Sequence, residues 1–220
     1  MTSKPVLKVR LLGSLYDSLS DLYGEVEDYD KQGTMLNLAH EIFSTLMEED
    51  SDNELLLRDY AQNGLRKLQF LDQRLQDYKT ALELISQIDA VLEKASKMLE
   101  ESIKIKQIFS TFLLYSVRIK LHAQKIEDAL REINRYLEFM SHEIEENNAI
   151  GFIPLLWAGL DLLFEVTLEL GLFELAQNLV SLELKFKQSF IQKKMIKEEE
   201  AELGSITQKV EYLQRFQSKD

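Results

Sequence analysis

Three histidines, His40, His122 and His142, are the side chains of this sequence best suited to hold a metal or to carry a proton. None of them belongs to a His-Glu-x-x-His pair, the helical spacing of many zinc sites, or to the Glu-x-x-His pair of di-iron bundles. Cysteine is absent, which excludes disulfides and thiolate metal sites. The sequence therefore predicts no metal and no cofactor.

The glycines of this sequence do not match the pattern of a phosphate-binding site. Gly13, Gly24, Gly33 and Gly64 are isolated, and no Gly-Lys-Ser/Thr follows any glycine, so a phosphate-binding loop is not expected. His40 could be a phosphoacceptor, but a partly exposed histidine beside an acid is the simpler interpretation. We expect a protein that is not an enzyme, with an unrecognised catalytic arrangement as the alternative left open.

Three carboxylates, Asp161, Glu165 and Glu169, recur every four residues within an apolar stretch. On a helix they share one face, where like charges repel by a few tenths of a kcal/mol per pair. A solvent-facing stripe explains this pattern most simply. The alternative is a stripe that lines a groove and meets a cationic partner.

Net charge limits the partners. The sequence has 38 Asp and Glu against 26 Lys and Arg, a net charge of −12, which disfavours nucleic acids and anionic membranes. Residues 149–173 are apolar and long enough to span a membrane, yet the three carboxylates interrupt them, so a buried helix of a soluble protein is predicted. The lack of cysteine and of a signal-peptide core favours the cytoplasm.

Long helices with short connections are expected, because 220 residues contain only two prolines and eight glycines. Apolar residues at steps of three and four predict amphipathic helices from Tyr78, Ile126 and Phe173 onward. The full set of eight or nine expected helices covers 6–23, 34–49, 53–74, 78–99, 103–122, 126–144, 151–170, 173–190 and, more weakly, 204–217. The predicted fold class is all-α.

Three segments share one plan: QDYKTA (76–81), QKIEDA (124–129) and GLFELA (171–176). Each places a bulky residue three positions before an alanine, as a helical hairpin needs where its two helices approach closely. The alanines, Ala81, Ala129 and Ala176, are 48 and 47 residues apart, and a fainter match at Ala39 lies 42 residues before Ala81. Regular spacing of this kind predicts stacked antiparallel hairpins in one domain.

These turns make the chain resemble the tetratricopeptide-repeat family over roughly residues 34–190. The matches are Gln76-Tyr78-Ala81, Gly171-Phe173-Ala176 and, more loosely, Gln124-Ile126-Ala129. That family repeats about every 34 residues, so longer helices are expected here, and its small residue in the first helix is replaced by Gln69, Val117 and Phe164. The resemblance implies one α-solenoid domain over 1–220, with an N-terminal helix in 1–33, hairpins in 34–203 and a capping helix in 204–220. An irregular bundle is the alternative.

The resemblance also implies a concave groove that binds a protein or peptide, and hence a non-catalytic scaffold or adaptor. The groove would be basic at one end and acidic at the other. Phe70 stands where a chaperone-binding carboxylate clamp has asparagine, which argues against that ligand. The groove-facing candidates are Asn63, Arg66, Lys67, Phe70, Arg74, Tyr115, Arg118, His122, Asp161, Glu165 and Glu169.

Two other functions fit the composition. The apolar C-terminal face of Ile206, Val210 and Leu213 is compatible with a structural subunit whose faces are covered by sister chains, for instance a homodimer. The apolar helix at 151–170 could instead line the pocket of a small-molecule or lipid carrier.

Overall fold

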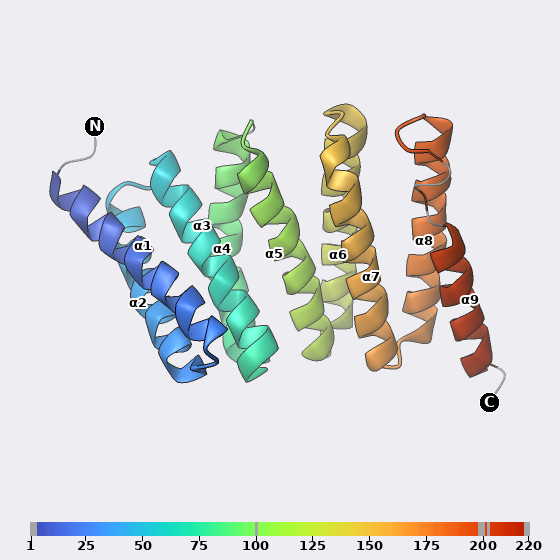
Figure 1. Cartoon of the computed structure of the whole chain (residues 1–220), viewed down its shortest axis with the longest axis horizontal. Helices are drawn as coiled ribbons and strands as arrows, with labels where there is room; N and C mark the ends of the chain where they lie inside the picture. Colours follow the sequence, from blue (N-terminus) through green and yellow to red (C-terminus); the bar gives the residue numbers. More distant parts are fainter. Residues whose placement is uncertain (1–3, 100, 198–200, 202, 218–220) are drawn as a thin grey trace. The chain divides into compact units, whose positions relative to one another are not determined.

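The computed structural model describes residues 4–99, 101–197, 201 and 203–217. Within these ranges the chain forms nine α-helices and no strand, which confirms the all-α prediction (Figure 1). The helices are α1 (Lys4–Glu25), α2 (Tyr29–Glu49), α3 (Glu54–Phe70), α4 (Tyr78–Met98), α5 (Ile103–His122), α6 (Ile126–Ser141), α7 (Ile153–Glu169), α8 (Phe173–Gln192) and α9 (Leu203–Gln217). Short π-helical turns, η1 (Leu71–Leu75) and η2 (His142–Glu146), extend α3 and α6, and a 3-10 turn, η3 (Ile150–Phe152), precedes α7.

The helices divide into two compact units, Met1–Ala123 and Gln124–Asp220. The first unit contains α1 to α5, and the second contains α6 to α9. The expectation that 1–220 is a single helical-repeat domain stays a prediction.

The three turns singled out in the sequence share one backbone conformation. Gln76, Gln124 and Gly171 each adopt a left-handed conformation, with φ of 52°, 58° and 69°. A left-handed residue just after a helix ends it by turning the chain away from the helix axis. The next helix then begins two residues later, at Tyr78, Ile126 or Phe173, in each case at the bulky residue of the plan.

A fourth turn of this kind was missed from the sequence. Glu27 is left-handed with φ of 60°, and the side chain of Asp28 accepts a hydrogen bond from the Lys31 amide, so α2 begins at Tyr29 rather than at residue 34. The turn escaped notice because Gln32 occupies the position of the alanine. The left-handed residues of these four turns, 27, 76, 124 and 171, are therefore 49, 48 and 47 residues apart, and two further left-handed residues, Asn148 and Lys194, lie outside this spacing.

In the first unit each helix packs against its neighbours in the chain. Helix α3 also contacts α1 and α5, so α1, α3 and α5 form one layer, with α2 and α4 behind it in Figure 1. Ala81 is fully buried between the layers, as the close approach at that turn requires. The largest fully buried side chains of this unit are Leu36, Phe43, Leu56, Leu57, Leu68, Ile88, Leu92, Ile105, Phe112 and Leu113.

In the second unit α7 packs on α8, and α8 packs on α9. The Tyr136 hydroxyl of α6 donates a hydrogen bond to the Leu155 carbonyl of α7 at 3.1 Å. Ala129 and Ala176 are fully buried. Helices α7, α8 and α9 share an apolar cluster of Phe164, Ala176, Val180, Ile206 and Leu213.

Helix α9 covers this cluster with only part of its expected face. Ile206 and Leu213 are buried, but Val210 is 38% exposed. Lys209, beside Val210, instead reaches Asp161 of α7 and Glu183 of α8. Ile206 and Leu213 thus pack against α8, and the role of α9 as the cap of an array stays a prediction.

One segment, Ile150–Glu169, is apolar and long enough to cross a membrane. The core helix of a folded domain passes the same test, and half of the most apolar window is buried inside the fold.

Candidate functional site

A buried polar network joins α1, α2 and α3 around Asn63, one of the expected groove residues. The Asn63 amide nitrogen donates to Asp17 Oδ1 at 2.9 Å. Its amide oxygen lies 2.9 Å from His40 Nδ1, so the histidine is the donor in that bond. Asn63 is therefore not groove-facing, because it is fully buried and both ends of its side chain are used inside the fold.

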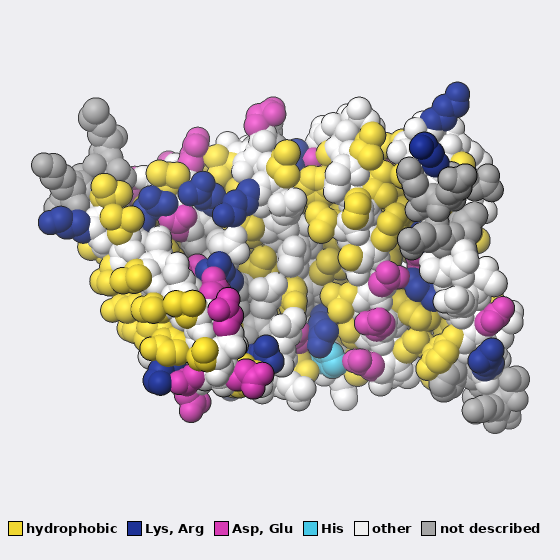
Figure 2. Space-filling model, viewed as in Figure 1, with side chains coloured by type: hydrophobic (Ala, Val, Ile, Leu, Met, Phe, Trp, Pro, Cys, Tyr) yellow, Lys and Arg dark blue, Asp and Glu magenta, His cyan; other side chains and the backbone are white. Residues whose placement is uncertain are grey.

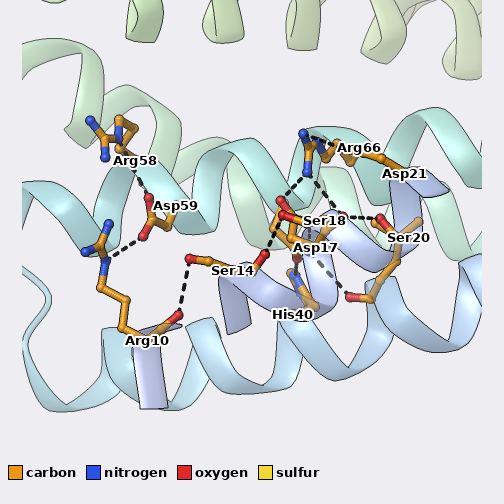
Figure 3. Close-up of polar contacts among 12 residues, drawn as sticks. Arg10, Ser14, Asp17, Ser18, Ser20, Asp21, His40, Arg58, Asp59 and Arg66 are labelled. Carbon is orange, nitrogen blue, oxygen red and sulfur yellow. Dashed lines mark hydrogen bonds and ion pairs between the residues drawn. The ribbon is translucent and has the colours of Figure 1, made fainter. Parts of the chain in front are cut away.

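Arg66 belongs to the same network. Its guanidinium pairs with the Asp17 carboxylate and, at 3.0 Å, with Asp21 (Figure 3). The side chain is 31% exposed, so Arg66 reaches solvent only in part and its charge is already paired. The sequence did not reveal these partners because Asp17 and Asp21 lie more than 40 residues earlier, on α1.

Burial controls the protonation of the network. Loss of solvent raises the pKa of Asp17, while the hydrogen bond from Asn63 and the charge of Arg66 oppose that rise. Burial, together with the positive charge of Lys67, lowers the pKa of His40 from 6.5 to about 4. Burial also lowers the pKa of Lys67, and the charge of Glu41 counters part of that effect. At neutral pH the network therefore holds a neutral histidine.

The network exists because α1 buries small and polar residues. Gly13, Asp17 and Ser20 are buried. A Cβ on Gly13 would come within 2.9 Å of the Phe43 ring, so only glycine allows α1 this close to α2. Arg10 adds an ion pair from α1 to Asp59 of α3 at 2.6 Å (Figure 3).

A second cluster gathers three of the expected site residues around Asp72, which the sequence did not single out. Asp72 lies in η1 with a fully buried side chain, and Arg118 Nε approaches its Oδ2 to 2.9 Å. The two groups touch, yet neither Asp72 oxygen accepts a well-aligned hydrogen bond. Burial raises the pKa of Asp72, and the charges of Arg118 and His122 oppose that rise. Tyr115 also belongs here, since the charge of Asp72 adds to burial in raising its pKa.

Three further residues of the expected groove, Phe70, Arg74 and His122, pack against side chains of the first unit. Phe70 is buried, and its ring would meet a Cβ placed on Gly33 at 2.9 Å. The Arg74 guanidinium is exposed and lies 4.6 Å from the centre of the Tyr29 ring, a cation–π contact. His122 stacks on Tyr78 with ring centres 5.0 Å apart.

A small polar pocket of about 140 Å³ opens beside Arg66 and Arg74. Its wall is mostly polar. The lining residues are Ser20, Asp21, Gln32, Leu36, Arg66, Gln69, Phe70, Gln73 and Arg74.

The three carboxylates of α7 form an acidic row, defined as Asp161, Glu165 and Glu169. All three are exposed, and Figure 2 shows acidic side chains following α7. Asp161 pairs with Lys209, which also contacts the buried Glu183. Glu165 and Glu169 have no ion-pair partner in the described part of the chain. Two negative charges of the row are thus left to solvent.

An apolar hollow of about 550 Å³ lies where α6 and α8 begin. Its apolar wall comes from Ile126, Leu130, Leu172, Phe173 and Leu175. The carrier hypothesis placed a pocket along 151–170 instead. Among the residues that the structure describes, no three His, Asp or Glu side chains are grouped to hold a metal ion.

Comparisons with protein-family models, with curated proteins and with solved structures give no match for this chain.

Proposed function

We propose that this chain is a non-catalytic, cytoplasmic scaffold that binds a protein or peptide, built as an array of antiparallel helix pairs similar to tetratricopeptide repeats. The observation that carries the proposal is the recurrence of one turn at residues 27, 76, 124 and 171. Each turn separates two long helices, and the pairs α1–α2, α3–α4 and α7–α8 each pack within one unit. Stacked pairs of this kind bury a continuous core and leave one layer of helices free to bind extended partners.

The acidic row of α7 is the proposed contact surface of the second unit. Glu165 and Glu169 are one helical turn apart and repel each other, and a basic partner residue placed between them would relieve that repulsion. Such rim charges speed association and select partners more than they add affinity. The partner segment is therefore proposed to carry lysine or arginine.

The proposed basic end has fewer cations available for a partner than the sequence implied. Arg66 and Arg118 already neutralise buried aspartates. Arg74 keeps an exposed guanidinium at the mouth of the polar pocket, beside the amides of Gln69 and Gln73. These groups match a partner carboxylate or peptide carbonyl, so Arg74 is the cation proposed to bind.

Charge reversal on α7 tests the proposal. The variant Glu165→Lys with Glu169→Lys should lose specific partners in affinity purification from the native cell, because two exposed contacts change sign. The fold should remain intact, since neither side chain is buried. Melting temperature and circular dichroism check that condition.

The matched control is Glu83→Lys with Glu138→Lys, which changes two exposed acids of α4 and α6 and gives the same net charge. It should retain the partners that the wild type captures. If both double variants retain them equally, α7 is not the contact surface. If the wild type captures no specific partner, the scaffold proposal fails.

The apolar hollow between α6 and α8 supports a second candidate function, the binding of a small apolar ligand. Native mass spectrometry of the purified chain tests it. A bound mass that disappears in Leu130→Asp, a substitution of an exposed lining residue, would favour the carrier.

A further inference from the structure

Helix α1 has its apolar and polar faces reversed relative to an ordinary surface helix. It turns Gly13, Asp17 and Ser20 inward, whereas five of its six leucines are exposed. The exposed apolar side chains of α1 and the residues just after it are Leu7 43%, Val9 43%, Leu11 57%, Leu12 42%, Leu15 54%, Leu22 57% and Val26 71%. Figure 2 shows the resulting hydrophobic patch at the α1 end of the first unit. A contiguous patch of this kind marks an interaction surface.

The outward face of α1 carries a narrower pattern, which we call the α1 seam. Its six members are all exposed and alternate steps of three and four residues, the spacing at which two helices pack side by side. They are Lys8, Leu11, Leu15, Ser18, Leu22 and Glu25.

The α1 seam is complementary to itself when read in reverse. In an antiparallel pair centred between Leu15 and Ser18, the basic end of one seam meets the acidic end of the other, and the leucines between them face each other. The small Ser18 lies opposite Leu15 and leaves room for it. The pairs are Lys8 with Glu25, Leu11 with Leu22, and Leu15 with Ser18, each formed twice.

We infer that the α1 seam binds the α1 seam of a second copy of this chain, in antiparallel orientation about a two-fold axis. The pairing covers leucines at the centre and places one ion pair at each end. It also explains Glu25, the last residue of α1, whose carboxylate is repelled by the negative end of its own helix dipole. In the dimer Glu25 lies instead near the amino-terminal half of the partner helix.

The charges of α1 favour a second copy over a membrane. A helix that lies on an anionic membrane gains affinity from cations along its length. The carboxyl-terminal half of α1 carries Asp21 and Glu25, both exposed, and no cation. Asp21 is paired with Arg66, but the Glu25 carboxylate would face anionic headgroups, whereas in the antiparallel dimer it faces Lys8.

Charge reversal in the full-length chain tests the pairing. Sedimentation velocity over a concentration series should show a reversible dimer of the wild type. Lys8→Glu alone and Glu25→Lys alone should each weaken dimerisation at least tenfold, because each places like charges together at both ends. The double variant, Lys8→Glu with Glu25→Lys, should restore it, because it re-forms the ion pair with the charges exchanged.

Single introduced cysteines test the antiparallel orientation of the dimer, since the native chain has no cysteine. A mixture of Leu11→Cys and Leu22→Cys proteins should give a mixed disulfide under mild oxidation. Neither variant alone should crosslink, because 11 residues of helix put identical positions about 16 Å apart along the axis, far beyond disulfide reach.

Leu15→Glu should abolish the dimer, while Leu55→Glu, which changes a similarly exposed leucine of α3, should leave it unchanged. A chain that is monomeric at every concentration would overturn the inference. So would crosslinking of each cysteine variant with itself, or binding of the monomer to phosphatidylserine-containing vesicles that Leu15→Glu abolishes. A dimer insensitive to Leu15→Glu would place the contact elsewhere and also overturn it.

Discussion

Polar side chains of the first unit hold α1, α2 and α3 together, and two of them, Asn63 and Arg66, were expected to bind a partner. Asn63 shows the physical reason why a residue expected in a binding groove is instead buried inside the fold. Counting along a repeat places a residue on a face, but whether its polar atoms meet solvent depends on helices far away in sequence. Asp17 and His40 satisfy Asn63 from two other helices, 46 and 23 residues distant. Pairings over such distances have no signal in one sequence.

Replacing Asn63 by alanine should lower the free energy of unfolding by about 1–3 kcal/mol, because the buried Asp17 and His40 each lose a hydrogen-bond partner. Chemical denaturation measures the change. Asn37→Ala, at an exposed position of α2, is the control and should be close to neutral. Equal stabilities for both variants would contradict the network.

Stability should fall as the solution is acidified through the titration range of His40. In the unfolded chain this histidine takes up a proton near its ordinary pKa of 6.5, but in the fold its pKa is about 4. Between those values the unfolded state binds more protons, so the contribution present above pH 6.5 is lost on the way down to pH 4, by up to about 3 kcal/mol.

The His40→Gln variant isolates this effect, since glutamine does not titrate. The difference in unfolding free energy between wild type and variant should depend on pH between 6.5 and 4 and be constant above that range. A difference that does not change with pH would show that His40 titrates alike in both states.

At the scale of elements, the periodicity of apolar residues was sufficient to place the helices and their class. The left-handed turn residues were the stronger signal, since three of the four turns were located to the residue. The fourth was missed because Gln32 replaces the alanine, and the Gln32 side chain there packs against Gly24 of α1. The π-helical turn η1, which buries Asp72, has no distinct sequence pattern and was not predicted.

Ala129→Leu should destabilise the chain by about 1–3 kcal/mol, because Ala129 is fully buried at the start of α6 and extra methylenes would overpack the contact. Thermal unfolding followed by circular dichroism measures the loss. Ala158→Leu, at an exposed position of α7, should leave the melting temperature nearly unchanged. An unchanged melting temperature for Ala129→Leu would argue against a close-packed turn.

Helix α9 offers a matched pair for testing its packing. Ile206→Ala should cost roughly 2–4 kcal/mol, because Ile206 is buried in the cluster with Phe164 and Val180. Val210→Ala removes an exposed side chain from the same helix and should cost far less. Similar losses for the two variants would show that α9 does not pack as described.

At the scale of the whole molecule, the described helices fall into two compact units. The sequence predicted a groove with a basic and an acidic end. Two of the basic residues, Arg66 and Arg118, neutralise aspartates inside the first unit, which a count of charges along the chain cannot reveal. Glu165 and Glu169 lie on the exposed side of α7, as a solvent-facing stripe and a groove both require, so the acidic end stays a prediction.

The claim that this molecule is a scaffold that binds a basic partner segment along α7 is tested most directly by carboxylate footprinting. The chain is labelled with a carbodiimide, alone and with its captured partner, and the labelling of each acid is read by mass spectrometry. The account predicts that the partner protects Glu165 and Glu169 severalfold and leaves Glu83 and Glu138, exposed acids of α4 and α6, unchanged. Protection of Glu83 and Glu138 with no change at Glu165 and Glu169 would contradict it.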